Sequence, residues 1–412
     1  MPNTVTFETS ENTSTAKFHF ENSQDIEVTS VKKPLNEGGG SLLDYTVTFS
    51  ADGNDYYIAS CLDGDSITAP TSPNKAGYAF MGWFTGEGGS GTKVAFPYTP
   101  SADTTFYAYH VAAVKATVTG VGSSSPSAVT FDVDDGFTVA GIGIEEVTMG
   151  GDTFIKIPTM YRKVNTAVDN QITSFTISTA AIDNTYQPYS VFVDENGNLL
   201  DYVLIGKYWN SSSSNMISQS QSGAVSMTIG NARTFAQARG AGYQQYDWQF
   251  QKLWQDLIVV FKRTYDTNAG TAFWTYDEMG IYWGTNGCWI DGICHNSAVI
   301  AVSDKPSKYV DSATASSDGY FGVSYNLPTT GSGNIIKLGY DSAHPFVNYP
   351  SAASGSSYTS YYCDVYYYSS GPHPVASCVG SAGAYNGAFR CGAHNAWSDA
   401  DSVRLCYRPV SA

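Results

Sequence analysis

The stretch that most constrains the fold is residues 244–265, the one clear helical pattern in a chain of 412 residues. Its apolar side chains recur at i, i+3, i+4, i+7, i+8 and i+11, the spacing of one face of an α-helix. They are Phe250, Leu253, Trp254, Leu257, Ile258 and Phe261. Asp247 precedes them and suits the N-cap, because its carboxylate can accept hydrogen bonds from free backbone N–H groups. A shorter helix is expected at about Arg233–Arg239, stopped by Gly240-Ala241-Gly242.

The rest of the chain has a composition typical of strands and loops, with 40 Gly and 30 Tyr. A chain of this length should hold two or three domains. Only 14% of its residues are charged, against roughly 25% in an average globular protein. The net charge of −16 argues against binding to nucleic acid or anionic membranes, because both need basic patches.

The sequence also bears on the cellular context of the protein. No apolar run reaches the length of a membrane span, so no membrane insertion is expected. Residues 1–18 have neither a basic start nor an apolar stretch, and we therefore expect no signal peptide. The seven cysteines are an odd number, and for a chain folded in a reducing cytosol free thiols are the default expectation.

Two small β-rich parts are expected before residue 112. Residues 1–41 show alternating runs typical of half-buried strands, at 4–7, 17–20 and 25–28, followed by a Gly-rich linker at 34–40. Residues 42–111 are expected to form a second unit. Its Gly77–Phe84, Lys93–Phe96 and Thr105–Tyr109 segments, with Asp65–Pro70 before them, resemble the Listeria–Bacteroides repeat. The resemblance implies a β-grasp-like module that acts as a spacer, with Trp83 and Phe84 in its core.

Residues 112–412 are expected to form one ligand-binding domain. Phe154–Arg162 and Asp201–Tyr208 read as strands because β-branched residues alternate along them. Asp194–Asn198 between them is a hairpin turn signal. It is not expected to bind calcium, because position twelve of such a loop is Ile205 rather than Glu.

The last part of that domain, at about 358–409, reads as a displayed binding surface. Six tyrosines fall between Tyr358 and Tyr368, in a background of Ser, Gly, Ala, Asn and Asp. Tyr offers large, stiff contact area and the small polar residues offer adaptable hydrogen bonding. Period-2 alternation leaves a second interpretation open for about half of these tyrosines, in which they pack inward as strand core. The run is interrupted by two short hydrophobic segments that could fix it to the rest of the domain, here called anchors: Ala388–Arg390 and Val403–Leu405.

The order of the segments in this region resembles that of a known protein family. Gly380-Ser381, Gly387–Phe389, the small polar run 394–402 and Val403–Pro409 resemble the C-terminal segment of C-type-lectin-fold proteins. More narrowly, they resemble the variable proteins of diversity-generating retroelements, many of them phage tail receptor-binding proteins. The resemblance extends over roughly 114–409. It implies an α+β fold, namely a C-terminal C-type lectin fold with long loops and two helices, preceded by the small β-rich N-terminal modules.

The function that this resemblance implies is recognition of a bacterial surface protein or glycan by a phage or prophage tail protein, located on the virion or a cell surface. Display as a trimer or another homo-oligomer would add avidity. The alternative is a bacterial adhesin or lectin with a fixed glycan site. Phe389, Arg404 and Leu405 should be scaffold. The expected ligand contacts lie between the anchors: Tyr366, Tyr367, Tyr368, His373, Ser381, Ala384, Tyr385, Asn386, His394, Asn395, Trp397 and Asp399.

Catalysis and cofactors are not expected. Formylglycine-generating enzymes are of the lectin-like fold, and Arg390-Cys391 resembles their second active-site cysteine. The partner cysteine belongs five residues earlier, where this chain has Asn386. A metal site is not expected either, because Cys288, Cys294 and His295 lack the CxxC spacing of structural zinc sites.

Overall fold

The structure is a computed structural model, and its described residues fall into eighteen ranges. In strands β1–β3, β18, β19 and β22–β24, and in the last three residues of β17, only the course of the backbone is described. The ranges are 6–10, 13–20, 23–31, 44–123, 128–167, 171–220, 223–265, 276–283, 288–296, 299–303, 320–326, 328, 333–354, 365–367, 372–377, 388–389, 391–393 and 402–410.

Strands dominate the fold. They make up 41% of the structure against 12% helix, which points to an all-β class. The expectation of an α+β fold is therefore wrong. Both helices read from the sequence exist, but they are the only two α-helices among the described residues, and the strands pair into five sheets. None of the described helices is long and apolar enough to cross a membrane.

The chain divides into two compact units, the first drawn from residues 1–71 and 82–109 and the second from 72–81 and 110–412. The first unit contains an antiparallel sheet of order β1-β2-β3, in which the runs at 17–20 and 25–28 lie in strands as predicted. The predicted linker at 34–40 lies outside the described residues. The strand bounds are β1 Thr6–Ser10, β2 Thr13–Phe20 and β3 Ser23–Val31.

A second sheet, of order β5-β4-β7-β6, is built around aromatic side chains. Phe49 and Phe106 are completely buried, and the Phe49 ring lies 4.8 Å from that of Trp83 in an edge-on contact. Trp83 therefore belongs to the core, as predicted, while Phe84 is half-buried. The elements are β4 Asp44–Ala51, β5 Asn54–Leu62, β6 Tyr78–Phe84, β7 Thr104–Ala112 and the short helix η1 Glu87–Gly89.

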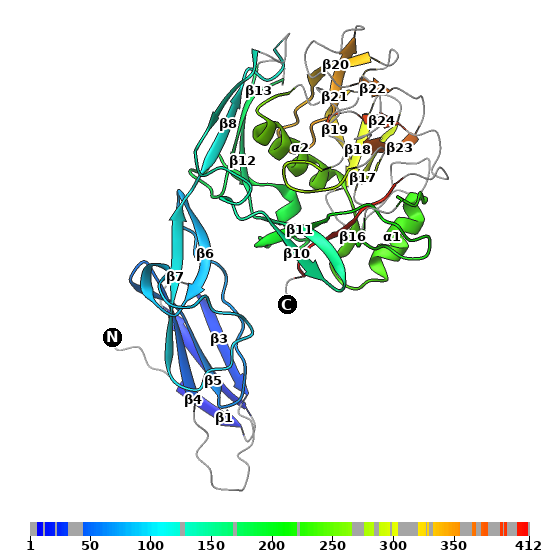
Figure 1. Ribbon diagram of the computed structural model, residues 1–412. Coiled ribbons are helices and arrows are strands. Elements are labelled where there is room, and N and C mark those ends of the chain that lie inside the picture. Colours follow the sequence, from blue (N-terminus) through cyan, green and yellow to red (C-terminus); the bar gives the residue numbers. More distant parts are fainter. Residues whose placement is uncertain are drawn as a thin grey trace. The chain divides into compact units, whose positions relative to one another are not determined.

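Three sheets make up the second unit (Figure 1). Their orders are β14-β12-β13-β8-β9, β10-β11-β15-β25-β16 and β19-β18-β17-β23-β24-β22-β20-β21. The bounds in the first sheet are β8 Lys115–Thr119, β9 Thr130–Val133, β12 Tyr161–Thr166, β13 Ile172–Ser178 and β14 Gln187–Pro188. Those in the second are β10 Glu145–Met149, β11 Asp152–Pro158, β15 Tyr202–Gly206, β16 Tyr243–Gln245 and β25 Leu405–Tyr407.

The third sheet contains most of the later strands. Its members are β17 Cys288–Asn296, β18 Val299–Ser303, β19 Tyr320–Asn326, β20 Gly333–Leu338, β21 Pro350–Ser354, β22 Val365–Tyr367, β23 Pro372–Ser377 and β24 Cys391–Ala393. Outside the sheets lie the helices α1 Ile229–Gln237, α2 Trp248–Lys262 and η3 Ser190–Phe192.

Helix α2 is the centre of the second unit and lies between the sheet of β12 and β13 and the sheet of β17 (Figure 1). Twelve of its 15 residues are buried, so it is enclosed on nearly all sides rather than along one stripe. The Asp247 carboxylate caps it as predicted and accepts from the backbone N–H groups of Gln249 and Phe250. At the other end Arg263 adopts the left-handed conformation that ends many helices.

Helix α1 begins earlier than predicted, at Ile229, after a Thr228 N-cap that accepts from the Asn231 N–H. The sequence signal was weak there, because Gly230 and Asn231 are poor helix formers. The turn at Asp194–Asn198 is confirmed. The Asp194 carboxylate accepts from the backbone N–H groups of Asn196 at 2.9 Å and of Asn198 at 2.7 Å.

Candidate functional site

Only part of the predicted ligand-contact surface lies within the described residues. Tyr366 and Tyr367 lie in β22 and His373 lies in β23, so the eight-stranded sheet contains both segments. Strand β24 runs between them, with Cys391 paired to Tyr366 on one side and to Ser377 on the other. The other predicted contacts lie outside the described residues: Tyr368, Ser381, Ala384, Tyr385, Asn386, His394, Asn395, Trp397 and Asp399.

The first anchor, at Ala388 and Phe389, is buried and fixed to α2. Two side-chain amides of that helix donate to the Ala388 carbonyl oxygen, Gln251 Nε2 at 3.2 Å and Gln255 Nε2 at 2.9 Å. The Phe389 ring stacks on that of Tyr265 with a centroid distance of 5.3 Å. Phe389 is therefore scaffold, as predicted.

The second anchor is Arg404, which is completely buried with its guanidinium packed against two indole rings. Its Cζ lies 4.1 Å from the ring centroid of Trp209 and 4.4 Å from that of Trp283. The guanidinium also donates to the carbonyl oxygens of Gly206 and, at 2.6 Å, of Tyr282. Burial lowers the pKa of Arg404, and the cation–π contacts favour its charged form. The prediction that Arg404 and the buried Leu405 are scaffold is confirmed.

Asp277 holds one of the two indoles that contact Arg404, that of Trp283. Its buried Oδ2 accepts from Nε1 of Trp254 at 2.7 Å and of Trp283 at 2.9 Å. Its Oδ1 accepts from the backbone N–H groups of Met279 and Ile281. Burial raises the pKa of this carboxyl, and the bonds from the two indoles oppose that rise. The sequence offered no sign of this role, because the partners of Asp277 are set by the fold.

Buried ion pairs join α1 to β17 and α2 to β12, and a third lies within α2. Arg233 and Asp291 lie 2.7 Å apart and Arg162 lies 2.9 Å from Asp256. Lys252 also pairs with Asp256, at 2.7 Å. Buried pairs of this kind are costly to break, since removing one partner leaves an unpaired charge. They fix the two helices against the neighbouring strands.

Cysteine and metal chemistry is not evident in the described residues. The thiols of Cys61, Cys288 and Cys406 are free. Burial raises the pKa of Cys406 far above its usual range, which makes it a poor nucleophile. No three His, Cys, Asp or Glu side chains among those described are placed to hold a metal ion. The side chains of Cys294 and His295 lie outside this description.

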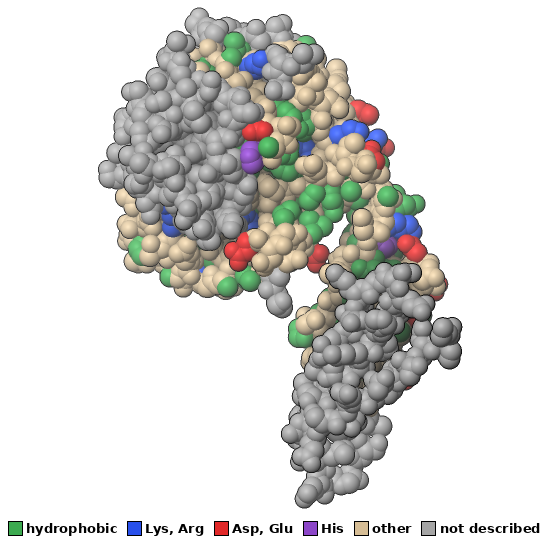
Figure 2. All heavy atoms as spheres, turned by 180° about the vertical axis from the view of Figure 1, so that it is seen from behind, with side chains coloured by type: hydrophobic (Ala, Val, Ile, Leu, Met, Phe, Trp, Pro, Cys, Tyr) green, Lys and Arg blue, Asp and Glu red, His purple; other side chains and the backbone are tan. Residues whose placement is uncertain are grey.

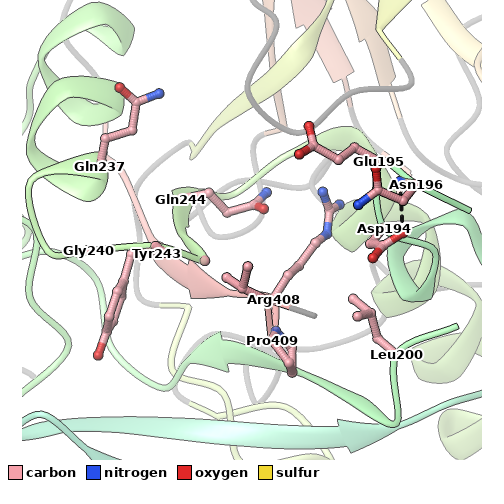
Figure 3. A pocket seen from close by; sticks show the side chains of 13 residues that line it. Asp194, Glu195, Asn196, Leu200, Gln237, Gly240, Tyr243, Gln244, Arg408 and Pro409 are labelled. Carbon is pink, nitrogen blue, oxygen red and sulfur yellow. Dashed lines mark hydrogen bonds between the residues drawn. The ribbon is translucent and has the colours of Figure 1, made fainter. Parts of the chain in front are cut away.

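A pocket of about 390 Å³ opens where the last strand ends. The Gly240–Gly242 turn after α1, the Asp194–Asn196 turn and residues 408–410 contribute to its walls. Figure 3 shows the Arg408 guanidinium between the side chain of Gln244 and the 194–196 turn. No sequence signal singled out this pocket, because three distant segments form it.

Comparisons with known proteins identify one part of the chain. Residues 45–109 match the Listeria-Bacteroides repeat domain, which confirms the module predicted at 42–111. A comparison with curated proteins finds no match.

Proposed function

We propose that the chain is a receptor-binding protein whose variable region, at about 358–409, recognises a bacterial surface protein or glycan. It acts by binding rather than catalysis, and the fitting context is a phage or prophage tail. The order of segments from Gly380 to Pro409 supports this proposal through its resemblance to variable proteins of diversity-generating retroelements, including the C-type-lectin-like C-terminal pattern.

The observation that carries the proposal is the way the two anchors are held. Two side-chain amides of α2 hold the Ala388 carbonyl oxygen, and the Tyr265 ring just after that helix stacks on Phe389. Arg404 is held by the indoles of Trp209 and Trp283. A segment fixed at such points can change the residues between them without losing its attachment. Replaceable contacts on a fixed support are what a diversified recognition surface requires.

The charge of the protein agrees with a protein or glycan ligand. On the face shown in Figure 2 the described surface consists largely of uncharged side chains and backbone, with basic and acidic atoms scattered. A single site of this kind is expected to be weak, because association costs several kcal/mol of lost freedom. Several copies on one particle would raise the overall avidity.

A binding assay on bacterial cells tests this function. The variant replaces Tyr366, Tyr367, Tyr385 and Trp397 together with Ser, and its control replaces the exposed tyrosines Tyr56 and Tyr57 with Ser. Hot-spot aromatic residues each contribute roughly 2 kcal/mol or more, so binding of the first variant should fall at least a hundredfold while the control binds normally. Unchanged binding by a folded first variant would refute the proposal.

The DNA beside the gene offers a second, independent test. A near-copy of the codons for about 358–409, differing at adenines and lying beside a reverse transcriptase gene, is the expected finding. An adhesin with a fixed glycan site would have no such copy. Its absence would exclude the retroelement part of the proposal.

A further inference from the structure

The pocket at the end of the last strand contains buried hydrogen-bond donors that lack acceptors. Arg408 is only 4% exposed, and its Nη2 donates to Asp247 Oδ2 at 2.9 Å and to Gln249. Its Nε and Nη1 have no partner among the described residues. A buried donor without an acceptor costs about 1–3 kcal/mol. The side chain also lines the pocket. Its Nε and Nη1 are closed off there, so a ligand oxygen would become their missing acceptor once the guanidinium shifts toward the pocket.

An acceptor lies across the pocket from these donors. Glu195 is exposed and has no hydrogen-bond or ion-pair partner among the described residues. The neighbouring Asp194 carboxylate is occupied by its own turn, since it accepts from the backbone and side chain of Asn198. Glu195 is therefore the carboxylate available to a ligand, and Figure 3 shows it among the residues that line the pocket.

The local charge selects against anions. The positive charge of Arg408 is already balanced by Asp247, 2.9 Å away. Asp194 and Glu195 then leave the pocket with an excess of negative charge. Like charges disfavour association, so acidic ligands should be rejected.

The rest of the pocket wall consists of apolar side chains and of the backbone of a glycine turn. Leu200, Pro409 and Val410 provide apolar surface. The Gly242 turn is held against the last strand, because Arg408 N donates to the Gly242 carbonyl oxygen at 2.9 Å. Gly242 has φ +84°, and an added Cβ would lie 2.3 Å from the Arg408 carbonyl oxygen. Only glycine allows this approach, so the wall is fixed before any ligand binds.

We infer that this pocket is a second, fixed binding site for a neutral sugar. A hydroxyl group can both donate and accept hydrogen bonds, so one sugar can accept a hydrogen bond from Arg408 and donate one to Glu195. The C–H face of the ring can pack on the apolar wall. The volume of about 390 Å³ is at the small end of the range for small-molecule pockets, which suits a monosaccharide or disaccharide. The site uses none of the predicted contacts of the variable region.

Titration of the full chain with a panel of methyl glycosides, followed by NMR, tests this inference. The panel contains neutral hexoses and N-acetylhexosamines, with glucuronic acid and glucosamine for comparison. At least one neutral sugar should bind with a Kd on the order of 1 mM, typical of a ligand of this size. It should also shift the Arg408 Nε–H resonance, because that group gains an acceptor.

Two variants and one matched control locate the binding. Ala241→Trp fills the pocket from an exposed lining position and should abolish sugar binding. Glu195→Gln should weaken binding roughly tenfold, since a hydrogen bond to a charged group is lost. Ala238→Trp adds the same bulk at an exposed position outside the pocket and should bind like the parent protein.

Three outcomes would overturn the inference: no neutral sugar binds the parent chain, the Ala241→Trp variant binds as well as the parent, or the acidic sugar binds best. The variant that lacks Tyr366, Tyr367, Tyr385 and Trp397 separates this site from the proposed receptor site. It should lose cell binding and keep sugar binding.

Discussion

Replacing Arg404 with Met tests how the last strand is held in the fold. The substitution keeps an unbranched side chain but removes the guanidinium that packs against Trp209 and Trp283. It leaves the carbonyl oxygens of Gly206 and Tyr282 without their donor, at about 1–3 kcal/mol each. The lost cation–π contacts add about 2 kcal/mol. Relief from burying a charge offsets part of this sum, and we expect a net loss of about 3–5 kcal/mol.

Urea unfolding measures that loss. Trp209 and Trp283 flank the substitution, so tryptophan fluorescence should report on the second unit. The chain has two compact units, and each transition must therefore be fitted separately. Lys115→Met, at an exposed position, is the control and should stay within about 0.5 kcal/mol of the parent. A loss below about 1 kcal/mol for Arg404→Met would refute the role given to this side chain.

Three further predictions concern stability. Asp247→Ala removes the α2 cap and leaves Arg408 as an unpaired buried charge, so urea unfolding should show a loss of about 3–5 kcal/mol. Gly242→Ala should lower stability by at least about 2 kcal/mol, because the added Cβ meets backbone at a positive φ; an unchanged midpoint would contradict this. Burial raises the pKa of Cys406 and Tyr189. The native state keeps protons that the unfolded chain releases, which lowers stability as the pH rises. Burial lowers the pKa of Lys252 to about 7, and this opposes the fall up to its ordinary pKa of 10.5. Stability should therefore fall above about pH 10.5, and a flat profile from there to about pH 12 would oppose that reasoning.

The local patterns in the sequence predicted local structure well. Helix α2 and its Asp247 cap followed from apolar spacing and a single side chain, and the Asp194 turn followed from its composition. Both depend on neighbours within a few residues. The start of α1 was missed because Gly230 lies in its first turn.

The fold class was wrong for a different reason. Two helices are conspicuous in sequence, whereas short strands with many Gly, Ser and Tyr residues are not. Their pairing joins distant segments, as β25 shows by lying between β15 and β16. The same distance hid the pairs of Arg408 with Asp247 and of Arg233 with Asp291. The sequence alone does not distinguish a carboxylate that becomes buried from one that stays exposed.

The central claim is that a fixed frame holds a patch whose side chains are interchangeable. Its most direct test is the thermal unfolding of a library in which all the predicted contacts are randomised while Phe389, Arg404 and Leu405 are kept. We predict that most members unfold cooperatively at the temperature of the parent chain, within a few degrees. General loss of cooperative unfolding across the library would contradict the claim, because the contacts would then be part of the frame.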